Sequence, residues 1–263
     1  MTRPATILRI PAIALVLLTS AACEIDFVPR AEAREEWRKT YTVEAGGSLE
    51  IENGNGKIVV RPGSGPDIEI VATRIAKAGT EEAAKKLLGE MEIQESAGAS
   101  SVKLSSRVSR VNWGGTQYQV NYEVRAPAGL ALTLAATNGT IDVADWDGRV
   151  EMSATNGTLD ATGLSGGVKA ETTNGRIDIR LDALHEDGVS LDTTNGRVAL
   201  ELPPDAKGRI LARVTNGSIS VDGLNADPSS SNTRRRYEAT LNGGGGPTVS
   251  IETTNGAIRV RGR

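Results

Sequence analysis

An Asn-Gly dipeptide recurs at nearly regular intervals through the second half of the chain, inside segments such as TLAATNGTIDV, AETTNGRIDI and IETTNGAIRV. Successive copies are separated by 18, 18, 21, 21 and 39 residues, counted between the asparagines Asn138, Asn156, Asn174, Asn195, Asn216 and Asn255. The last gap has the length of two units, which predicts that one unit has lost its Asn-Gly or has been replaced by an insertion. A fixed period of this size is typical of a solenoid or an array of stacked units.

Apolar residues alternate on both sides of each Asn-Gly, and a seventh copy, SLEIENGNGKIVV around Asn55, has the same pattern. The third residue after the asparagine is a branched aliphatic in every copy: Ile58, Ile141, Leu159, Ile177, Val198, Ile219 and Ile258. The residues four before and five after the asparagine are also apolar, whereas the fourth residue after it is mostly polar. Because alternate residues of a strand face opposite sides, each unit is predicted to contain a strand, an Asn-Gly corner and a second strand.

Two ways of stacking these units are compatible with the pattern. In a β-meander each Asn-Gly is a two-residue hairpin turn. That arrangement sets Glu171 directly opposite Asp178, and two like charges in that position are destabilising. In a parallel β-solenoid, or β-helix, each unit is one coil and equivalent residues stack on one another. The solenoid also explains why one residue type recurs in turns as well as in strands, so we expect an all-β fold built as a parallel β-solenoid.

The seven asparagines are interpreted as structural corner residues. Asn tolerates positive φ, Gly has no Cβ, and stacked Asn amides are able to hydrogen-bond along a column as a ladder. The alternative is that these asparagines bind a ligand or carry a glycan, since the Asn-Gly-Thr triplets also match a glycosylation sequon.

The opening SLEIENGNGKIVV, the TTNGRIDI-type repeats and the closing VSIETTNGAIRV resemble the bacterial putative adhesin family of β-strand-repeat proteins, a domain of unknown function. The resemblance covers about residues 40–263 and depends on the repeat pattern. It implies a β-strand-repeat fold and a place in the cell envelope, as an exported protein or lipoprotein. It carries over no functional residues.

Residues 1–22 are typical of a secretory signal peptide, with two arginines before an apolar run, Ile10–Leu18, that is too short to span a bilayer as a stable helix. Cys23, the only cysteine, follows a Ser-Ala-Ala sequence. This segment resembles the lipobox of bacterial lipoproteins, which predicts a lipid on Cys23 and attachment to a membrane. The serine departs from the usual leucine of that motif, and the same small residues also permit ordinary cleavage, which releases a soluble periplasmic protein.

Residues 23–39 are mostly charged and are predicted to form a flexible tether. Residues 40–130 are predicted to hold strands with one amphipathic helix inserted near residues 80–92, for which Thr80 is a suitable N-cap. The helix is expected to cover a sheet face or the end of the solenoid, and binding of a partner protein is the alternative. Three nearby aromatic residues form either core packing or a binding platform: Trp113, Tyr118 and Tyr122.

The solenoid is predicted over residues 131–263, with a mobile loop near residues 225–246. This segment is rich in Ser and Gly, which favours a loop. It also carries three adjacent arginines, Arg234, Arg235 and Arg236. These side chains either remain solvated or contact anionic lipid head groups or an acidic glycan.

Residue counts limit the chemistry of the chain. A Ser-His-Asp or Cys-His site requires His185, the single histidine, and one histidine with one cysteine are too few for a Cys/His zinc site. Lys and Arg number 30 against 33 Asp and Glu, a balance without the basic footprint of a nucleic-acid-binding protein. We therefore expect no nucleic-acid partner, no metal, no cofactor and no catalytic residues.

The favoured function is a non-catalytic, adhesin-like protein of the bacterial cell envelope, whose rigid solenoid surface contacts a protein or a polysaccharide. One alternative is a β-helical polysaccharide lyase or hydrolase, because Asp142, Asp160 and Asp178 form an acidic column about 4.8 Å apart that is also able to bind Ca²⁺. Against it, the repeats between residues 138 and 220 contain one aromatic residue, Trp146, whereas sugar-cleaving grooves are usually aromatic. A sensor or regulator of envelope stress is the third alternative.

Overall fold

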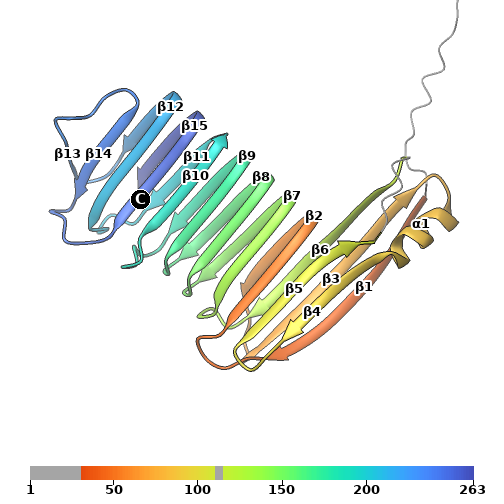
Figure 1. Cartoon of the computed structure of the whole chain (residues 1–263). Helices are drawn as coiled ribbons and strands as arrows, with labels where there is room; N and C mark the ends of the chain where they lie inside the picture. Colours follow the sequence, from red (N-terminus) through yellow and green to blue (C-terminus); the bar gives the residue numbers. More distant parts are fainter. Residues whose placement is uncertain (1–30, 110–114) are drawn as a thin grey trace, which may run out of the picture.

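Strands dominate the computed structural model, which describes residues 31–109 and 115–263 (Figure 1). The helix α1 (Glu81–Gly89) accompanies the strands β1 (Ala31–Thr42), β2 (Ser48–Pro62), β3 (Asp67–Ala78), β4 (Met91–Ala97), β5 (Ser101–Val108), β6 (Gln117–Ala126), β7 (Ala131–Trp146), β8 (Val150–Leu164), β9 (Val168–Leu181), β10 (Val189–Asn195), β11 (Val198–Leu202), β12 (Gly208–Asp222), β13 (Ala226–Pro228), β14 (Arg236–Leu241) and β15 (Thr248–Gly262). All these strands belong to one sheet. The predicted all-β class is confirmed. The predicted signal peptide, Cys23 and Trp113 lie outside the described residues.

The repeats form the rungs of a parallel stack, in the spatial order β2, β7, β8, β9, β10 with β11, β15 and β12, and Figure 1 shows the rungs in a row. Equivalent positions pair with one another, so that Asn156 lies between Asn138 and Asn174. Glu171 pairs with Ser153 and Asp192 on neighbouring rungs rather than with a residue of its own repeat. The predicted parallel stacking is therefore confirmed, and the β-meander is excluded.

The core runs along the inside of this stack. Inward-facing residues from both halves of the rungs belong to one apolar cluster, in which Ile58, Ile141 and Ile177 are fully buried. Burial of apolar surface is the main favourable term in folding, and here the two halves of a rung supply it jointly. Because this cluster is continuous from rung to rung, the stability of each rung depends on its neighbours.

Between their two apolar halves, the rungs β7, β8 and β9 each have four consecutive residues that are at least partly exposed, such as 137–140 in β7. The glycine in this segment is required by the close approach of the rungs. A Cβ added to Gly157 would lie 2.1 Å from the carbonyl oxygen of Gly139, and one added to Gly175 would lie 1.7 Å from that of Gly157. The seven repeat asparagines do not have the positive φ that was expected of a corner, since the non-glycine residues with positive φ in the described chain are Asp145 and Asn242.

The order of rungs along the chain differs from their order in space. β15, the last strand of the chain, lies between the β10 and β11 rung on one side and β12 on the other, and it is parallel to both. The chain therefore skips one position after β11, forms β12, and returns to fill the gap with β15. The sequence spacing alone did not predict this insertion.

The prediction of a mobile loop near residues 225–246 is wrong over two strands. β14 pairs antiparallel with the first half of β12, and β13 pairs with β14. Ala239 and Leu241 are buried on alternate positions of β14, so this strand adds apolar contacts while it covers the edge of β12. Composition favoured a loop because the apolar pattern occupies only a short part of a Ser- and Gly-rich segment.

At the other end the stack divides at β2. The first half of β2 pairs with β5, which is extended by β4, and the second half pairs with β6, which is extended by β3 and β1. Since β2 is itself a rung, the boundary predicted at residue 131 cuts through the solenoid.

The predicted tether of residues 23–39 needs a correction, because residues 31–39 belong to β1, antiparallel to β3. Trp37 packs against the core, and cross-strand ion pairs join Glu35 to Arg74 at 2.8 Å and Glu32 to Lys77 at 3.3 Å. The charges that indicated a spacer are the exposed side of a strand.

The helix α1 has the start that the sequence predicted, since Thr80 Oγ1 accepts a hydrogen bond of 3.2 Å from the backbone N–H of Ala83. Its buried residues, Ala84 and Leu87, face β1 and β3, so the helix covers the sheet at this end of the molecule (Figure 1). In the described part of the chain, no helix is long and apolar enough to cross a membrane.

Candidate functional site

The seven repeat asparagines are linked by side-chain hydrogen bonds into one ladder. The bonds measure 2.7 to 3.0 Å, and each runs from the Nδ2 of one asparagine to the Oδ1 of the next, in the order Asn216, Asn255, Asn195, Asn174, Asn156, Asn138 and Asn55. All the amides therefore point the same way along the stack. Asn55 is at the receiving end, and its own Nδ2 has no partner among the described residues.

Beside the ladder, an exposed groove of about 770 Å³ crosses the rungs β7 to β10 and ends against β5. One exposed threonine per rung lines it, immediately before each asparagine: Thr137, Thr155, Thr173 and Thr194. Glu171 and Asp192 add carboxylates, and the pKa of Asp192 is raised by partial burial and by the neighbouring Glu252 and Glu171. The groove is thus polar and repeats the same groups from rung to rung.

The predicted acidic column is present, but its carboxylates are paired with arginines. Asp142 is 2.9 Å from Arg61, and Arg176 reaches both Asp160 at 3.4 Å and Asp178 at 2.9 Å. Burial raises the pKa of Asp160, and the neighbouring Asp178 and Asp142 raise it further against the opposing effect of Arg176. Within residues 31–109 and 115–263, no cluster of His, Cys, Asp and Glu is suited to hold a metal ion.

His185 lies in the turn between β9 and β10, where its Nδ1 accepts a hydrogen bond of 3.2 Å from the backbone N–H of Asp187. Its other contact is with the Asp187 carboxylate, at 3.5 Å. No serine belongs to this pair in the described structure, so the histidine is not placed in a Ser-His-Asp arrangement there.

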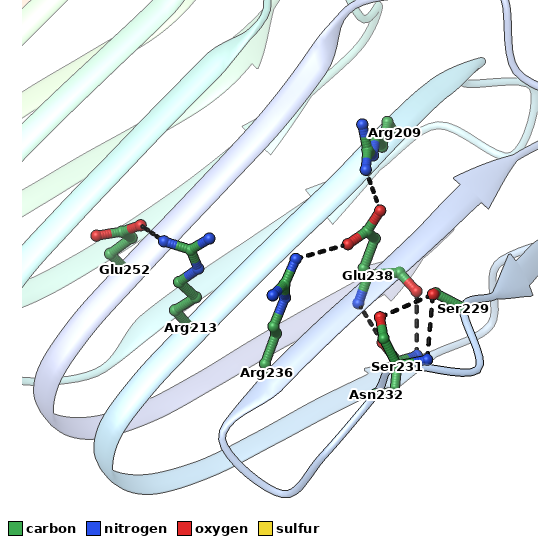
Figure 2. Close-up of polar contacts among 8 residues, drawn as sticks. All are labelled: Arg209, Arg213, Ser229, Ser231, Asn232, Arg236, Glu238 and Glu252. Carbon is green, nitrogen blue, oxygen red and sulfur yellow. Dashed lines mark hydrogen bonds and ion pairs between the residues drawn. The ribbon is translucent and has the colours of Figure 1, made fainter.

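The arginine triplet lies at the start of β14: Arg234 and Arg235 are in the turn before it, and Arg236, the member drawn in Figure 2, is its first residue. Arg236 and Arg209 both contact the carboxylate of Glu238, and these two hydrogen bonds lower the pKa of Glu238. Arg213 is 3.6 Å from Glu252. The guanidinium groups of Arg234 and Arg235 have no carboxylate within 4 Å among the described residues, whereas Arg209, Arg213 and Arg236 are each ion-paired with Glu238 or Glu252.

A larger cleft, of about 930 Å³, lies between β6 and the rungs β2 and β7. β6 pairs with β2 from Tyr122 onward, and its residues before Tyr122, which line the cleft, are outside this ladder. Three contacts hold the two strands together there. Asn53 Nδ2 donates to Val120 O at 2.8 Å, the Lys57 N–H donates to Asn121 Oδ1 at 3.0 Å, and Gly56 lies against the Val120 carbonyl.

Polar side chains dominate the lining of this cleft, with Asn55, Lys57, Gln119 and Asn121 among them. Of the predicted aromatic platform, Tyr118 is half-buried at the cleft, whereas Tyr122 is fully buried and its hydroxyl is 2.9 Å from Ser106 Oγ. The platform is therefore not formed by these two rings together. The amides and lysines of this cleft could not be predicted from the repeats, because they come from strands that the repeat pattern does not relate.

The model of the family Toastrack DUF4097 matches residues 38–261, and so spans the rungs and both ends of the stack. The chain belongs to the Toastrack DUF4097 family. The match covers almost the same residues as the resemblance to a repeat family of unknown function in the sequence, about 40–263. No curated protein matches this Toastrack chain.

Solved structures similar to this Toastrack protein include a putative cell adhesion protein from Clostridium sporogenes ATCC 15579, with 14% identity and a TM-score of 0.45 over 87% of this chain and 100% of that one. A putative adhesin from Bacteroides fragilis NCTC 9343 has 12% identity and a TM-score of 0.34 over 89% of this chain and 99% of that one. A putative lipid binding protein from Parabacteroides distasonis ATCC 8503 has 7% identity and a TM-score of 0.29 over 87% and 94%.

Proposed function

We propose that this Toastrack protein is a non-catalytic, adhesin-like component of the bacterial cell envelope whose solenoid surface contacts polysaccharide. The observation that carries the proposal is the polar groove beside the asparagine ladder, in which the same hydroxyl group recurs on Thr137, Thr155, Thr173 and Thr194. Neighbouring strands are about 4.8 Å apart, so the groove offers an extended row of equivalent hydrogen-bonding groups. Such a row suits a linear polymer with a repeating unit.

Rigidity of the surface supports this function. The ladder joins every rung to the next through its side chains. The glycines that follow these asparagines, such as Gly157 and Gly175, form a glycine column in which the backbones are in close contact. A surface that is already ordered loses little conformational entropy when it binds. A rigid row of groups is therefore a better binding surface than the same groups on mobile loops.

A non-catalytic role is favoured over the lyase or hydrolase alternative by the state of the acidic column. Glycoside hydrolysis uses two carboxyl groups that flank the bond to be cleaved. Here Asp142 and Asp178 are held in ion pairs of 2.9 Å by Arg61 and Arg176, away from the threonine groove. The threonines themselves have no histidine near them in the described structure.

Attachment to the envelope is proposed to occur through a lipid on Cys23, which follows a signal-like segment. Radiolabelled fatty acid should enter the wild-type protein and not Cys23→Ser, and the mature protein should fractionate with membranes. Unlabelled, soluble periplasmic wild type would reject the lipid and leave the other parts of the proposal in place.

Polysaccharide contact is tested by affinity electrophoresis of the full chain in gels that contain polygalacturonate, alginate, dextran or cellulose derivatives. Retardation in at least one gel is expected. The groove variant Thr155→Val/Thr173→Val keeps the side-chain shape and removes two hydroxyl groups, so it should reduce retardation by any polymer that lies in the groove. Migration that is unchanged in every gel would overturn the proposed function.

A further inference from the structure

We propose that the cleft between β6 and the rungs β2 and β7 binds a uronate residue of a polysaccharide, that is, a hydroxyl-rich ring that carries a carboxylate. The inference rests on the proposed function and gives it a specific site, distinct from the threonine groove. The cleft volume of about 930 Å³ lies within the usual range of ligand pockets, about 300–1,000 Å³.

The end of the asparagine ladder supplies the first donor. Because every Nδ2 in the ladder points toward Asn55, the chain of amides ends with an unpartnered Nδ2 at Asn55, which lines the cleft. Hydrogen bonds in a chain polarise one another, which strengthens the donor at its end. A ligand acceptor is the partner that this terminal group lacks within the described structure.

Asn121 faces the same cleft from β6. Its Oδ1 is occupied by the backbone N–H of Lys57, at 3.0 Å, which fixes the side chain and leaves the Nδ2 group free of partners among the described residues. The amide of Gln119 also lines the cleft and has both a donor and an acceptor available there. Sugar hydroxyls both donate and accept hydrogen bonds, so amides are suitable partners for them.

Charge in the cleft favours an anion. Lys57 and Lys77 line it against one carboxylate, that of Glu123. Lys77 is already 3.3 Å from Glu32, whereas no carboxylate lies within 4 Å of the Lys57 ammonium group in residues 31–109 and 115–263. A carboxylate on the ligand would give Lys57 the ion-pair partner that the protein does not provide.

Tyr118 completes the site with an aromatic surface at the edge of the cleft. It is half-buried, and its hydroxyl lies near Gly54, where an added Cβ would be 3.9 Å away. The ring therefore has an apolar body held against the backbone and a polar tip, and such rings pack against the apolar face of a ligand.

The test uses the full chain and fluorescently labelled trigalacturonate, with labelled maltotriose as the neutral probe, followed by anisotropy. Trigalacturonate should bind at least about tenfold more tightly than maltotriose, equivalent to about 1.4 kcal/mol. Lys57→Gln should remove most of this preference. The matched control Lys207→Gln removes the same charge from an exposed lysine outside the cleft, and it should leave both affinities within about twofold of wild type.

A second variant, Gln119→Ala, should weaken the binding of both probes, since it removes an amide without changing charge. A circular dichroism melt shows whether Lys57→Gln folds, and Gln119→Ala tests the cleft if it does not. Equal binding of both probes would overturn the uronate assignment. A different outcome is that polysaccharide gels retard the protein, and that Thr155→Val/Thr173→Val reduces this retardation but Lys57→Gln and Gln119→Ala do not. That result would overturn the assignment of the cleft and leave the proposed function in place. If no polysaccharide is retained, both fail.

Discussion

Asn255 donates a hydrogen bond of 2.8 Å to Asn195, although Asn216 lies between them in the sequence. Asn216 in turn donates to Asn255 at 3.0 Å, so the final repeat separates two repeats that are consecutive in the chain. β12 can be completed as a parallel rung only after β15 has returned, because among the described strands only β15 pairs with it in parallel. This end of the stack therefore depends on contacts between residues far apart in sequence.

The strand order is testable with engineered disulfides in a Cys23→Ser background. Ser190 and Ser250 are register partners on β10 and β15, so Ser190→Cys/Ser250→Cys should oxidise readily. Leu211 is the partner of Ser250 on the other side. The control pair Ser190→Cys/Leu211→Cys is therefore two strand spacings apart, about 9.6 Å, and should stay reduced. Gel mobility under non-reducing conditions distinguishes the two, and the opposite result would mean that the rungs follow sequence order.

The repeat pattern was sufficient to predict the parallel stack, because the alternation around Ile177 and its equivalents has only one register that turns all of them toward the core. It was not sufficient for the position of β15. Ile219 and Ile258 are equivalent in the pattern, and nothing in either residue records which rung it stacks against. The amide cleft escaped prediction for a related reason, since Lys57 and Asn121 meet through a division of the sheet at β2 that has no periodic signal.

The register itself is tested by two neighbouring residues of β9. Ile177 is fully buried, so Ile177→Asp should place an unpaired carboxylate in the core and unfold at least the central rungs. Asp178 is partly exposed and forms ion pairs with Arg176 and Arg197, so Asp178→Ala should cost less than about 1 kcal/mol. Urea denaturation measures both, and equal stabilities would contradict the register.

The glycine column predicts a second sharp contrast. In Gly175→Ala, the new methyl group would lie 1.7 Å from the Gly157 carbonyl oxygen, and backbone on both sides would have to move. We expect a loss of several kcal/mol or no folded protein, since overpacking alone costs about 1–3 kcal/mol. Gly129→Ala is the control, because no atom lies within 4 Å of its Cβ position. Similar melting temperatures for the two variants would show that the rungs are less closely packed.

Buried threonines on the inner side of the ladder predict a stabilising substitution. Thr193 is 1% exposed, and its Oγ1 has no hydrogen-bond partner in the described structure. Val214 occupies the position two residues before the asparagine on β12, as Thr193 does on β10, and it is also buried. Thr193→Val should therefore raise the free energy of unfolding by about 1 kcal/mol, whereas the exposed neighbour Thr194→Val should not. If Thr193→Val instead lowers the free energy of unfolding by about the same amount, the Thr193 hydroxyl forms a hydrogen bond in the folded protein.

The pKa of Asp160 is raised chiefly by partial burial. A raised pKa means that the folded state binds this proton more tightly than the unfolded state, so its contribution to stability is present at low pH and is lost as the pH rises through the folded pKa. Asp160→Asn removes the charge and keeps the shape. Its stability relative to wild type should therefore increase between about pH 4 and neutral pH.

The pKa shift of Glu238 is opposite in direction to that of Asp160, and so is its effect on the pH dependence of stability. Its pKa is lowered, first by the hydrogen bond from Arg209 and then by that from Arg236, so its ionised form stabilises the fold and this contribution is lost as the pH falls through the folded pKa. Glu238→Gln should be less stable than wild type at neutral pH, and the deficit should shrink on acidification. Urea denaturation of both variants from pH 3 to pH 7 should thus give differences from wild type that change in opposite directions. Parallel trends would show that one of the two carboxylates is not in the environment described.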